Sequence, residues 1–491
     1  PGLMVESTTV REYHTTYAAH ILGSMGAMDA DDWAKYEDQG YSMDAQIGQS
    51  GFEEAFEEYL HGIDGQRYDA VSKDGTIIEQ RYVDGKEPIA GSNVETTIDI
   101  DIQKIAEDAL ADAMDSFTNP DRNTSTSGDG LDAQGAAVVV MKVKTGEILA
   151  CASYPTYNLA TMQDDWDELI KDDLHPFFNR AFGAAYAPGS TYKPSTLTAA
   201  MMNGLYQRGE IIKDEGVFTK YPAFAPKCLF YASTGGGSTH GDIDAQYALR
   251  VSCNYFFYEL ASRCTWQMLD ETAKGFGLGE PTGIELTEIT GYRSNPDSKK
   301  ANHTGVDAAW GAGDRVLTGI GQAENRFTPL QLAVYACTLA NQGTRYKATF
   351  LNRVASSDYR TLVYENQPEI LSQMDISNDC YQTYLEGMRA VASLPGGTAS
   401  NYFGGVKDAP GRNYPVTVCA KTGTAQHASG GSDHGAFICF APMEDPEIAV
   451  ACFGEKVGHG SSLAKVADEI IESYYEMVRA SETFTYENKL S

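Results

Sequence analysis

The chain has 491 residues, of which 42% are hydrophobic and 21% are charged, a composition typical of globular proteins. At about 150 residues per domain, this length indicates two or three domains. The formal net charge of −31, from 37 basic and 68 acidic residues, gives a surface that would repel nucleic acid and anionic lipid. We therefore expect no nucleic-acid partner, whereas small neutral or zwitterionic substrates remain compatible with this charge.

Two further features concern the cellular compartment. The nine cysteines are an odd number without a Cys-x-x-Cys pair, which argues against a disulfide framework. No apolar run approaches the roughly 18 residues that a membrane span requires. The sequence opens on Pro1 without a signal-peptide pattern, so either the protein is cytosolic or a targeting segment lies outside these residues.

The first part of the chain alternates short strands and helices. Phe52–Leu60 is a candidate amphipathic helix, because its apolar side chains recur at every fourth position. Ile102–Met114 has a stronger apolar face and predicts a helix. Residues 119–132 are polar and glycine-rich, which is typical of a surface loop.

A β-hairpin is predicted next, with strands Ala136–Val143 and Glu147–Ala152 around Lys144-Thr145-Gly146. Residues 196–341 are mainly helical in pattern. The clearest of these helices has Thr328 as its N-cap, with Pro329 at its first position and Gln331 completing a capping box.

The last part predicts three strands, at Pro415–Ala420, Gly435–Ala441 and Ile448–Phe453, and a helix from Ser462 to about Met477. Strands early and late in the chain, with helices between them, predict an α+β domain whose sheet is assembled from distant segments.

One short motif could carry nucleophilic chemistry. Ser190 and Lys193 are three residues apart, so on a helix they share a face and the amine can reach the hydroxyl. Pro188-Gly189 before them and Pro194 after them predict that the serine lies at a helix N-terminus. The tetrad is weak alone, because Ser462-Leu-Ala-Lys465 has the same spacing.

Two further motifs complete an ordered set. Ser252-Cys253-Asn254 and Lys421-Thr422-Gly423 follow Ser190-x-x-Lys193 in the order found in penicillin-recognising serine enzymes. A second Lys-Thr-Gly, at residues 144–146, precedes Ser190 and is explained as the hairpin turn. The order therefore selects one set of three motifs.

The flanking residues closely resemble the class B penicillin-binding proteins. The resemblance rests on residues 188–194 and 421–426, and also on Arg11-x-Tyr13, residues 47–53, Thr97-Ile-Asp99 and Thr328–Ala333. One departure is Gly435-Ala436 after Asp433-His434, where the family often has an aromatic residue. The resemblance implies an N-terminal pedestal at 1–92, a transpeptidase domain at 93–482 and a tail at 483–491. The implied fold of the second domain is an antiparallel sheet flanked by helices plus an all-helical subdomain.

The resemblance also implies a function, a peptidoglycan D,D-transpeptidase that forms an acyl-enzyme on Ser190 and is acylated by β-lactams. Lys193 would be the general base if burial and a second cation, Lys421, keep it neutral. Ser252 would relay a proton and Asn254 would hold Lys193 and the substrate amide. The terminal carboxylate would bind Thr422 and Thr424 beside Gly423, and the N–H groups of Ser190 and Thr424 would form the oxyanion hole.

The implied setting is the extracytoplasmic face of the bacterial membrane, with an N-terminal anchor absent from this chain. Stem peptides ending in D-Ala-D-Ala, β-lactams and a glycosyltransferase of the cell-wall machinery are the expected partners, and no cofactor is expected. A D,D-carboxypeptidase or a β-lactam sensor of the same fold remains the alternative.

Three further groups of residues could form sites. Cys228, His240 and Cys253 could bind zinc, the two cysteines could pair, or all three could simply pack in the core, and no metal site is predicted. Gly275-x-Gly277-x-Gly279 lacks the context of a nucleotide site and predicts a loop. His427 and His434 could touch substrate, but solvated loop positions are favoured.

Overall fold

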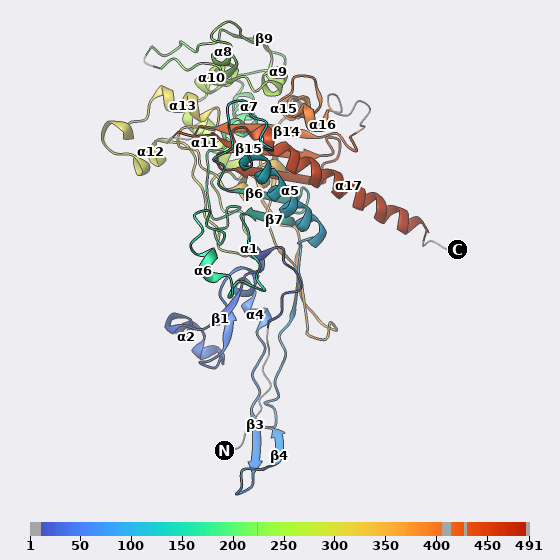
Figure 1. Ribbon diagram of the computed structural model, residues 1–491. Helices are drawn as coiled ribbons and strands as arrows, with labels where there is room; N and C mark the ends of the chain where they lie inside the picture. Colours follow the sequence, from blue (N-terminus) through green and yellow to red (C-terminus); the bar gives the residue numbers. More distant parts are fainter. Residues whose placement is uncertain (1–10, 223, 405–413, 427–429, 488–491) are drawn as a thin grey trace. The chain divides into compact units, whose positions relative to one another are not determined.

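The structure, a computed structural model, describes residues 11–222, 224–404, 414–426 and 430–487 (Figure 1). Contacts divide the chain into two compact units, one of residues 1–97, 156–172 and 350–367 and one of residues 98–155, 173–349 and 368–491. The domain boundaries predicted at residues 92 and 482 stay a prediction, and residues 488–491 of the predicted tail lie outside the described residues. In the described part of the chain, no helix has both the length and the apolar character needed to cross a membrane.

A five-stranded antiparallel sheet forms the centre of the larger unit, with the strand order β14-β15-β16-β6-β7. The early and late segments meet in register, since Val450 of β16 pairs with Val140 of β6. The predicted α+β domain with a sheet built from distant segments is confirmed. The strands are β6 (Ala136–Lys142), β7 (Ile148–Tyr154), β14 (Cys419–Ala425), β15 (His434–Ala441) and β16 (Ile448–Gly454).

The bounds predicted for β14 were wrong. The strand was expected at Pro415–Ala420 with the Lys-Thr-Gly motif after it, but it runs from Cys419 to Ala425 and contains the motif. Glycine and, to a lesser degree, lysine are depleted in strands, so the pattern of apolar residues points to the segment before the motif. Here the strand is held by pairing along its whole length with β15, from Cys419 opposite Phe440 to Ala425 opposite His434.

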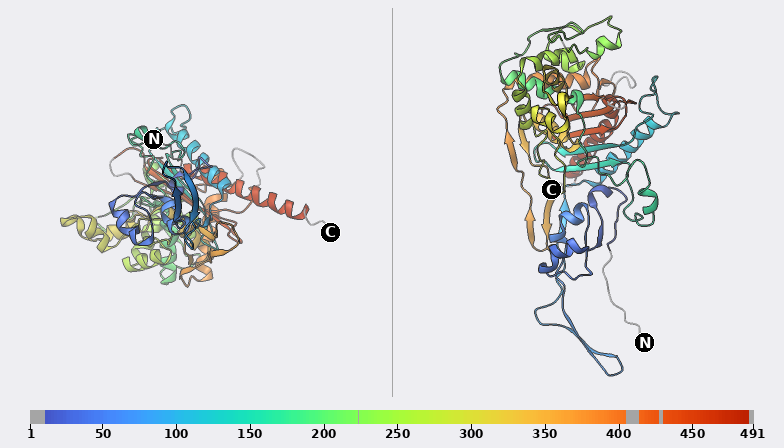
Figure 2. Two further views of the ribbon diagram at one scale, coloured as in Figure 1. Left: turned by 90° about the horizontal axis from the view of Figure 1, so that it is seen from below. Right: turned by 90° about the vertical axis from the view of Figure 1, so that its left-hand side faces the viewer.

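Helices cover both faces of this sheet. α5 (Ile100–Thr118) and α17 (Ala464–Glu487) run side by side against one face, as both views show (Figures 1 and 2). α14 (Pro329–Ala340) packs against β6, β15 and β16 and is buried along its whole length. The predicted capping box of α14 is confirmed, because the Thr328 hydroxyl accepts a hydrogen bond from the Gln331 N–H at 3.0 Å.

The helical part of the larger unit follows β7 and also contains one small strand pair, β8–β9. Its helices are α7 (Lys193–Met202), α8 (Leu229–Ser233), α9 (Ala245–Arg250), α10 (Asn254–Arg263), α11 (Trp266–Gly275), α12 (Pro296–Asn302) and α13 (Ala312–Thr318). The unit is completed by β8 (Ile212–Asp214), β9 (Gly241–Ile243), β10 (Thr344–Tyr346), β13 (Ile370–Gln373), α15 (Asn378–Ser393) and α16 (Ser400–Phe403).

The smaller unit holds three sheets, β1–β2, β3–β4 and β12-β11-β5. In this unit the segment around Gly23 packs on the segment around Ser50. Gly23 has a φ of +78°, and a Cβ there would lie 1.9 Å from the Ser50 carbonyl oxygen, so only glycine fits. The unit contains α1 (Ala19–Leu22), α2 (Ala30–Tyr36), α6 (Trp166–Leu169), β1 (Met25–Ala27), β2 (Gln46–Gly48), β3 (Arg67–Val71), β4 (Ile77–Tyr82), β5 (Asn93–Thr96), β11 (Leu351–Ala355) and β12 (Leu362–Glu365).

The helix predicted at Phe52–Leu60 is broken into α3 (Gly51–Ala55) and α4 (Glu57–Leu60). Phe56 lies at the break with φ of −111°. Glu57 follows, and its buried carboxylate accepts a hydrogen bond from the Gly48 N–H at 2.8 Å. This tertiary hydrogen bond involves a side chain that an amphipathic pattern places on the solvent face, which explains why the pattern predicted one continuous helix.

Candidate active site

Ser190 lies on a tight turn that leads into a buried helix. The 3-10 turn η2 (Gly189–Tyr192) continues directly into α7, with Pro194 in its first turn as predicted. Gly189 has a φ of +53°, and a Cβ there would lie 2.5 Å from the carbonyl oxygen of Thr424. Only glycine therefore lets this turn approach β14 so closely. Within the described residues the Ser190 hydroxyl has no hydrogen-bond partner, and it faces a cavity.

The three motifs meet at the hydroxyl of Ser252. Lys193 Nζ lies 3.1 Å from Ser252 Oγ and donates to the Ser252 carbonyl at 2.8 Å and to Asn254 Oδ1 at 2.7 Å. Lys421 Nζ lies 2.9 Å from the same Oγ and 2.8 Å from the Thr422 carbonyl. Segments at residues 190, 252 and 421 are thus brought together, as the order of the motifs predicted.

The backbone conformation of Ser252 sets the direction of this hydroxyl. Ser252 lies between α9 and α10 with φ of +55°, a left-handed conformation that is costly for a serine. Asn254 is the first residue of α10, so its amide is directed from a helix end toward Lys193. A strained residue kept in place by its surroundings is a common feature of functional sites.

Both lysine side chains are fully buried, and burial changes their protonation. Burial lowers the pKa of Lys193 to about 8. Burial, and then the charge of Lys193, lower the pKa of Lys421 well below its usual range. The sequence analysis expected burial and the charge of Lys421 together to keep Lys193 neutral. In the structure burial is the largest cause of the lowered pKa of Lys193, and repulsion between the two ammonium groups disfavours charging both at once.

β14 forms the wall of the site beside Ser190. A Cβ on Gly423 would lie 2.5 Å from the Pro188 carbonyl oxygen, so the glycine of the motif is needed for this close packing. The Thr422 hydroxyl lies 2.6 Å from that of Thr398, in the loop after α15. Thr398 was missed by the sequence analysis, because a single threonine after two glycines carries no recognisable pattern. Thr424 also lines the cavity.

The cavity in front of these groups has a volume of about 750 Å³, large enough for the end of a peptide. Ser190, Ser252, Asn254, Thr422 and Thr424 all contribute to its lining. Leu229, Phe230, Tyr247 and Ile320 add an apolar side, and Gln322, Gln426, Asp433 and His459 add polar groups. A cavity of this kind with two buried amines beside a free hydroxyl is suited to acyl transfer.

Two family models match the chain. The penicillin binding protein transpeptidase domain matches residues 136–472, which hold all three motifs, and the penicillin-binding protein dimerisation domain matches residues 1–96. The first match alone covers more than half of the sequence. The chain belongs to the penicillin-binding protein transpeptidase family. The resemblance to class B penicillin-binding proteins is therefore confirmed.

Named relatives agree with this assignment. Peptidoglycan D,D-transpeptidase MrdA of Acinetobacter baumannii is 27% identical, over 98% of this chain and 68% of the relative. MrdA of Haemophilus influenzae is 29% identical, over 96% of this chain and 71% of the relative. A solved structure of a peptidoglycan synthase complex, described as coordinating polymerization and crosslinking, matches with a TM-score of 0.80 at 25% identity, covering 95% and 76% of the two chains. The Helicobacter pylori penicillin-binding protein PBP2 in its complex with MreC shares the fold, with a TM-score of 0.73 at 23% identity over 94% and 78%.

The second copies of two motifs have structural explanations in this penicillin-binding protein. Lys144-Thr145-Gly146 forms the β6–β7 turn, and a Cβ on Gly146 would lie 2.1 Å from the Lys347 carbonyl oxygen. Ser462 lies in η4 (Gly460–Leu463), and Lys465 pairs with Asp112 and Glu469 on the surface.

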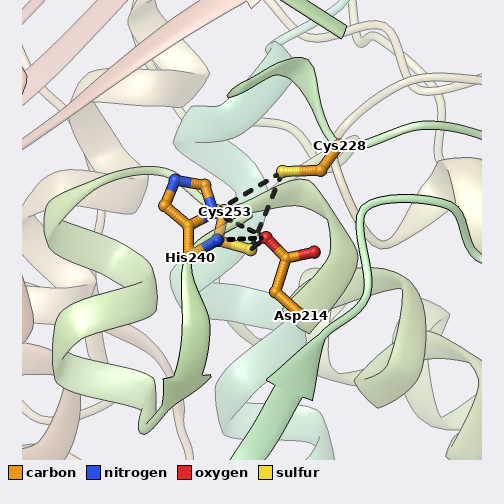
Figure 3. A group of neighbouring side chains, drawn as sticks. All are labelled: Asp214, Cys228, His240 and Cys253. Carbon is orange, nitrogen blue, oxygen red and sulfur yellow. Dashed lines mark hydrogen bonds and ion pairs between the residues drawn. The ribbon is translucent and has the colours of Figure 1, made fainter. Parts of the chain in front are cut away.

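A second cluster of reactive side chains includes Cys253, the residue between Ser252 and Asn254 (Figure 3). Its four members are Asp214, Cys228, His240 and Cys253, whose ligand atoms all lie within 4.8 Å of one another. Cys228 Sγ is 3.8 Å from Cys253 Sγ and 3.7 Å from His240 Nδ1, and Asp214 Oδ2 is 3.6 Å from Cys253 Sγ. Both cysteines are free thiols. The sequence analysis missed Asp214, because one acid among 68 has no distinguishing pattern.

The donor set of this cluster fits zinc. Two thiolates, one imidazole and one carboxylate are ligands that Zn²⁺ takes, and bonds of about 2.0–2.3 Å place tetrahedral ligands about 3.3–3.8 Å apart. Hydrogen bonds from Cys253 and His240 lower the pKa of Cys228 to about 4 against the effect of burial. Although burial opposes it, the hydrogen bonds that His240 and Gly216 donate lower the pKa of Asp214 to about 2. Ion binding here would fasten β8, β9, α8 and the start of α10 to one another.

The remaining candidates are His434, His427 and the glycines after residue 275. His434 begins β15 rather than lying in a solvated loop, and its Nδ1 accepts a hydrogen bond from the Lys456 N–H at 3.0 Å. His427 lies outside the described residues. Gly277 and Gly279 have φ of +85° and +71° after α11, which confirms the predicted loop.

Proposed function

We propose that the chain is a peptidoglycan D,D-transpeptidase in which Ser190 carries the acyl group. The observation that carries this proposal is the convergence of Lys193 and Lys421 on the Ser252 hydroxyl, beside a serine that opens onto a peptide-sized cavity. Family membership supports the reaction class, and the names of the MrdA relatives support the substrate, the peptide stem of peptidoglycan.

In the first half-reaction, Ser190 Oγ forms a bond to the carbonyl carbon of the penultimate D-Ala. Its proton passes to the neutral amine of Lys193. With a pKa of about 8, about a tenth of this amine is neutral at pH 7. The bond to the terminal D-Ala nitrogen then breaks, and the leaving amine takes a proton through the Ser252 hydroxyl, which both lysines contact. Asn254 holds Lys193 through its Oδ1 and the substrate amide through its NH₂ group.

In the second half-reaction, an amine of a neighbouring stem peptide attacks the acyl-enzyme. The new amide bond forms, the bond to Ser190 Oγ breaks, and the proton returns to the serine. The oxyanion is stabilised by the N–H groups of Ser190 and Thr424. β14 is an edge strand, so alternate N–H groups along it point away from the sheet toward the cavity.

The terminal carboxylate binds the hydroxyls of Thr422 and Thr424, with the amine of Lys421 nearby and Gly423 allowing the close approach of the Ser190 turn. β-Lactams, which resemble the D-Ala-D-Ala end, acylate the same serine. Their binding is supported by membership in the penicillin-binding family.

The proposed setting is the extracytoplasmic face of the bacterial membrane, where the substrate is found. The proposed partner is a glycosyltransferase of the cell-wall machinery, because a related chain belongs to a synthase complex that coordinates polymerization with crosslinking. A scaffold of the MreC kind is a second proposed partner, from the complex of the Helicobacter pylori relative.

Fluorescent penicillin tests this proposal with a matched control in the same chain. Ser190→Ala should abolish covalent labelling, whereas Ser462→Ala, which alters the other Ser-x-x-Lys, should label as the wild type does. The bound penicillin should be lost slowly, and an added D-amino acid should take up the acyl group of a peptide donor. Rapid release of hydrolysed penicillin would contradict a transpeptidase and favour a hydrolytic enzyme of the same fold.

A further inference from the structure

Arg250 lies at the rim of the proposed active-site cavity. It is the last residue of α9, and its neighbours Tyr247 and Val251 line the cavity. Its guanidinium carbon is 5.4 Å from the centroid of the Tyr247 ring. A Cβ on Gly396, another lining residue, would lie 3.6 Å from Arg250 Nη2. The guanidinium therefore lies close to two residues that line the cavity.

This guanidinium has no acidic partner among the described residues, and its Nε is buried without a hydrogen bond. Two other arginines of the same unit are paired with acidic side chains. Arg208 Nη2 lies 2.7 and 2.8 Å from the two oxygens of Glu386, and Arg263 pairs with Glu210 and Glu259. Arg315 and Arg326 of the same unit also have no acidic partner among the described residues, so Arg250 is distinguished by its place beside the cavity. Arg250 as a whole is only partly buried, so the outer part of its guanidinium remains accessible to a ligand.

The group that completes such a site is a carboxylate. Guanidinium binds carboxylates through two parallel hydrogen bonds, and the Tyr247 ring beneath it favours the charge through a cation–π contact. The location agrees with this chemistry. Thr398, two residues after Gly396, lies with its hydroxyl 2.6 Å from that of Thr422, one of the proposed carboxylate-binding residues. Arg250 therefore borders the side of the cavity to which the acidic end of a stem peptide is assigned.

We propose that Arg250 is a specificity-determining residue that binds a carboxylate of the stem peptide during acylation of Ser190. This inference rests on the proposed transpeptidase function. Two carboxylates could supply the ligand, the C-terminal one of D-Ala-D-Ala and the side-chain one of an acidic residue farther along the stem. The two carboxylates have the same chemistry, so donors that lack one or the other are needed to distinguish them.

The test uses three synthetic peptide donors that acylate Ser190. The first carries both carboxylates, the second has its C-terminal carboxylate amidated, and the third has its side-chain carboxylate amidated. Arg250→Met should lower kcat/KM for the first donor by about 10- to 50-fold, the size expected for a lost charge-assisted hydrogen bond. For the donor that lacks the bound carboxylate, the same substitution should change kcat/KM by less than about twofold. The donor whose kcat/KM is not changed by Arg250→Met lacks the carboxylate that Arg250 binds, and so identifies it.

Two further variants act as controls. Arg250→Lys should recover part of the loss, because it keeps the charge without the planar fork. Arg208→Met, which removes a paired surface arginine, should treat all three donors as the wild type does. An equal loss for all donors, or no loss at all, would overturn the inference. If the wild type itself is acylated by neither the donors nor penicillin, the proposed function fails rather than the role of Arg250 alone.

Discussion

Two serine–lysine pairs with identical spacing behave in opposite ways in this molecule. At Ser190-x-x-Lys193 the lysine is fully buried, and burial lowers its pKa to about 8. At Ser462-x-x-Lys465 the lysine is partly exposed, and its hydrogen bond to Asp112 raises its pKa. Spacing places a hydroxyl and an amine on one face of a helix, but the environment determines whether that amine can accept a proton.

The difference arises from what surrounds each amine. Lys193 contacts a carbonyl, a hydroxyl and an amide, none of which compensates its charge fully. Lys465 contacts two carboxylates at the surface. A buried amine with neutral partners and a second buried amine nearby is poised to lose its proton, whereas a surface ion pair keeps it.

The largest expected effect comes from removing the amine of Lys193, with removal of the Lys465 amine as the matched comparison. Lys193→Met should slow acylation by penicillin by about 10²- to 10⁴-fold, the range for loss of a general base. Lys465→Met should change it by less than about twofold, since a surface pair contributes little to the fold. Stopped-flow acylation rates at one pH measure both variants. Equal acylation rates for the two variants would show that the buried Lys193 is not the general base.

A smaller effect should appear in the pH dependence. The base must be neutral, so the second-order acylation rate should fall by about tenfold for each pH unit below about 8 and level off above it. The Lys465→Met variant should give the same curve, because that amine takes no part in the reaction. A rate that is constant between pH 6 and 9, while the fold is intact by circular dichroism, would remove Lys193 from the role of base.

The smallest effect on rate is expected at the cluster of Asp214, Cys228, His240 and Cys253. The purified protein should contain about one zinc ion per chain, and Cys228→Ser should lose it, with a fall in Tm on the order of 5 °C and acylation slowed a few-fold. Cys337→Ser alters another buried cysteine, in α14, and should keep the metal. Full metal content in the Cys228→Ser variant, measured by atomic emission, would show that these four residues do not hold the ion.

Much of the fold follows from local patterns. The apolar β-branched runs predicted β6, β7, β15 and β16 to within two residues, and the capping box of Thr328 predicted the start of α14. β14 was placed wrongly, because Lys421-Thr422-Gly423-Thr424 is polar and its strand conformation depends on pairing with β15 and packing on the Ser190 turn. The broken helix at Phe56 likewise depends on a tertiary contact.

The site residues also fall into those that local patterns predicted and those that depend on tertiary contacts. The order of the three motifs predicted which segments meet, and the structure brings Lys193, Ser252, Asn254 and Lys421 together. What the sequence could not supply are groups with no local pattern, such as Asp214 and Thr398, because only the folded chain brings them to the cluster and to β14. The pKa of Lys193 likewise depends on burial that no spacing encodes.

Mass spectrometry of the penicillin adduct tests the central claim most directly. After reaction with benzylpenicillin, the intact protein should gain the mass of one penicillin, and proteolysis should place the adduct on the peptide that contains Ser190. An adduct on the peptide that contains Ser252 or Ser462, or no adduct on a folded protein, would contradict the assignment of Ser190 as the nucleophile.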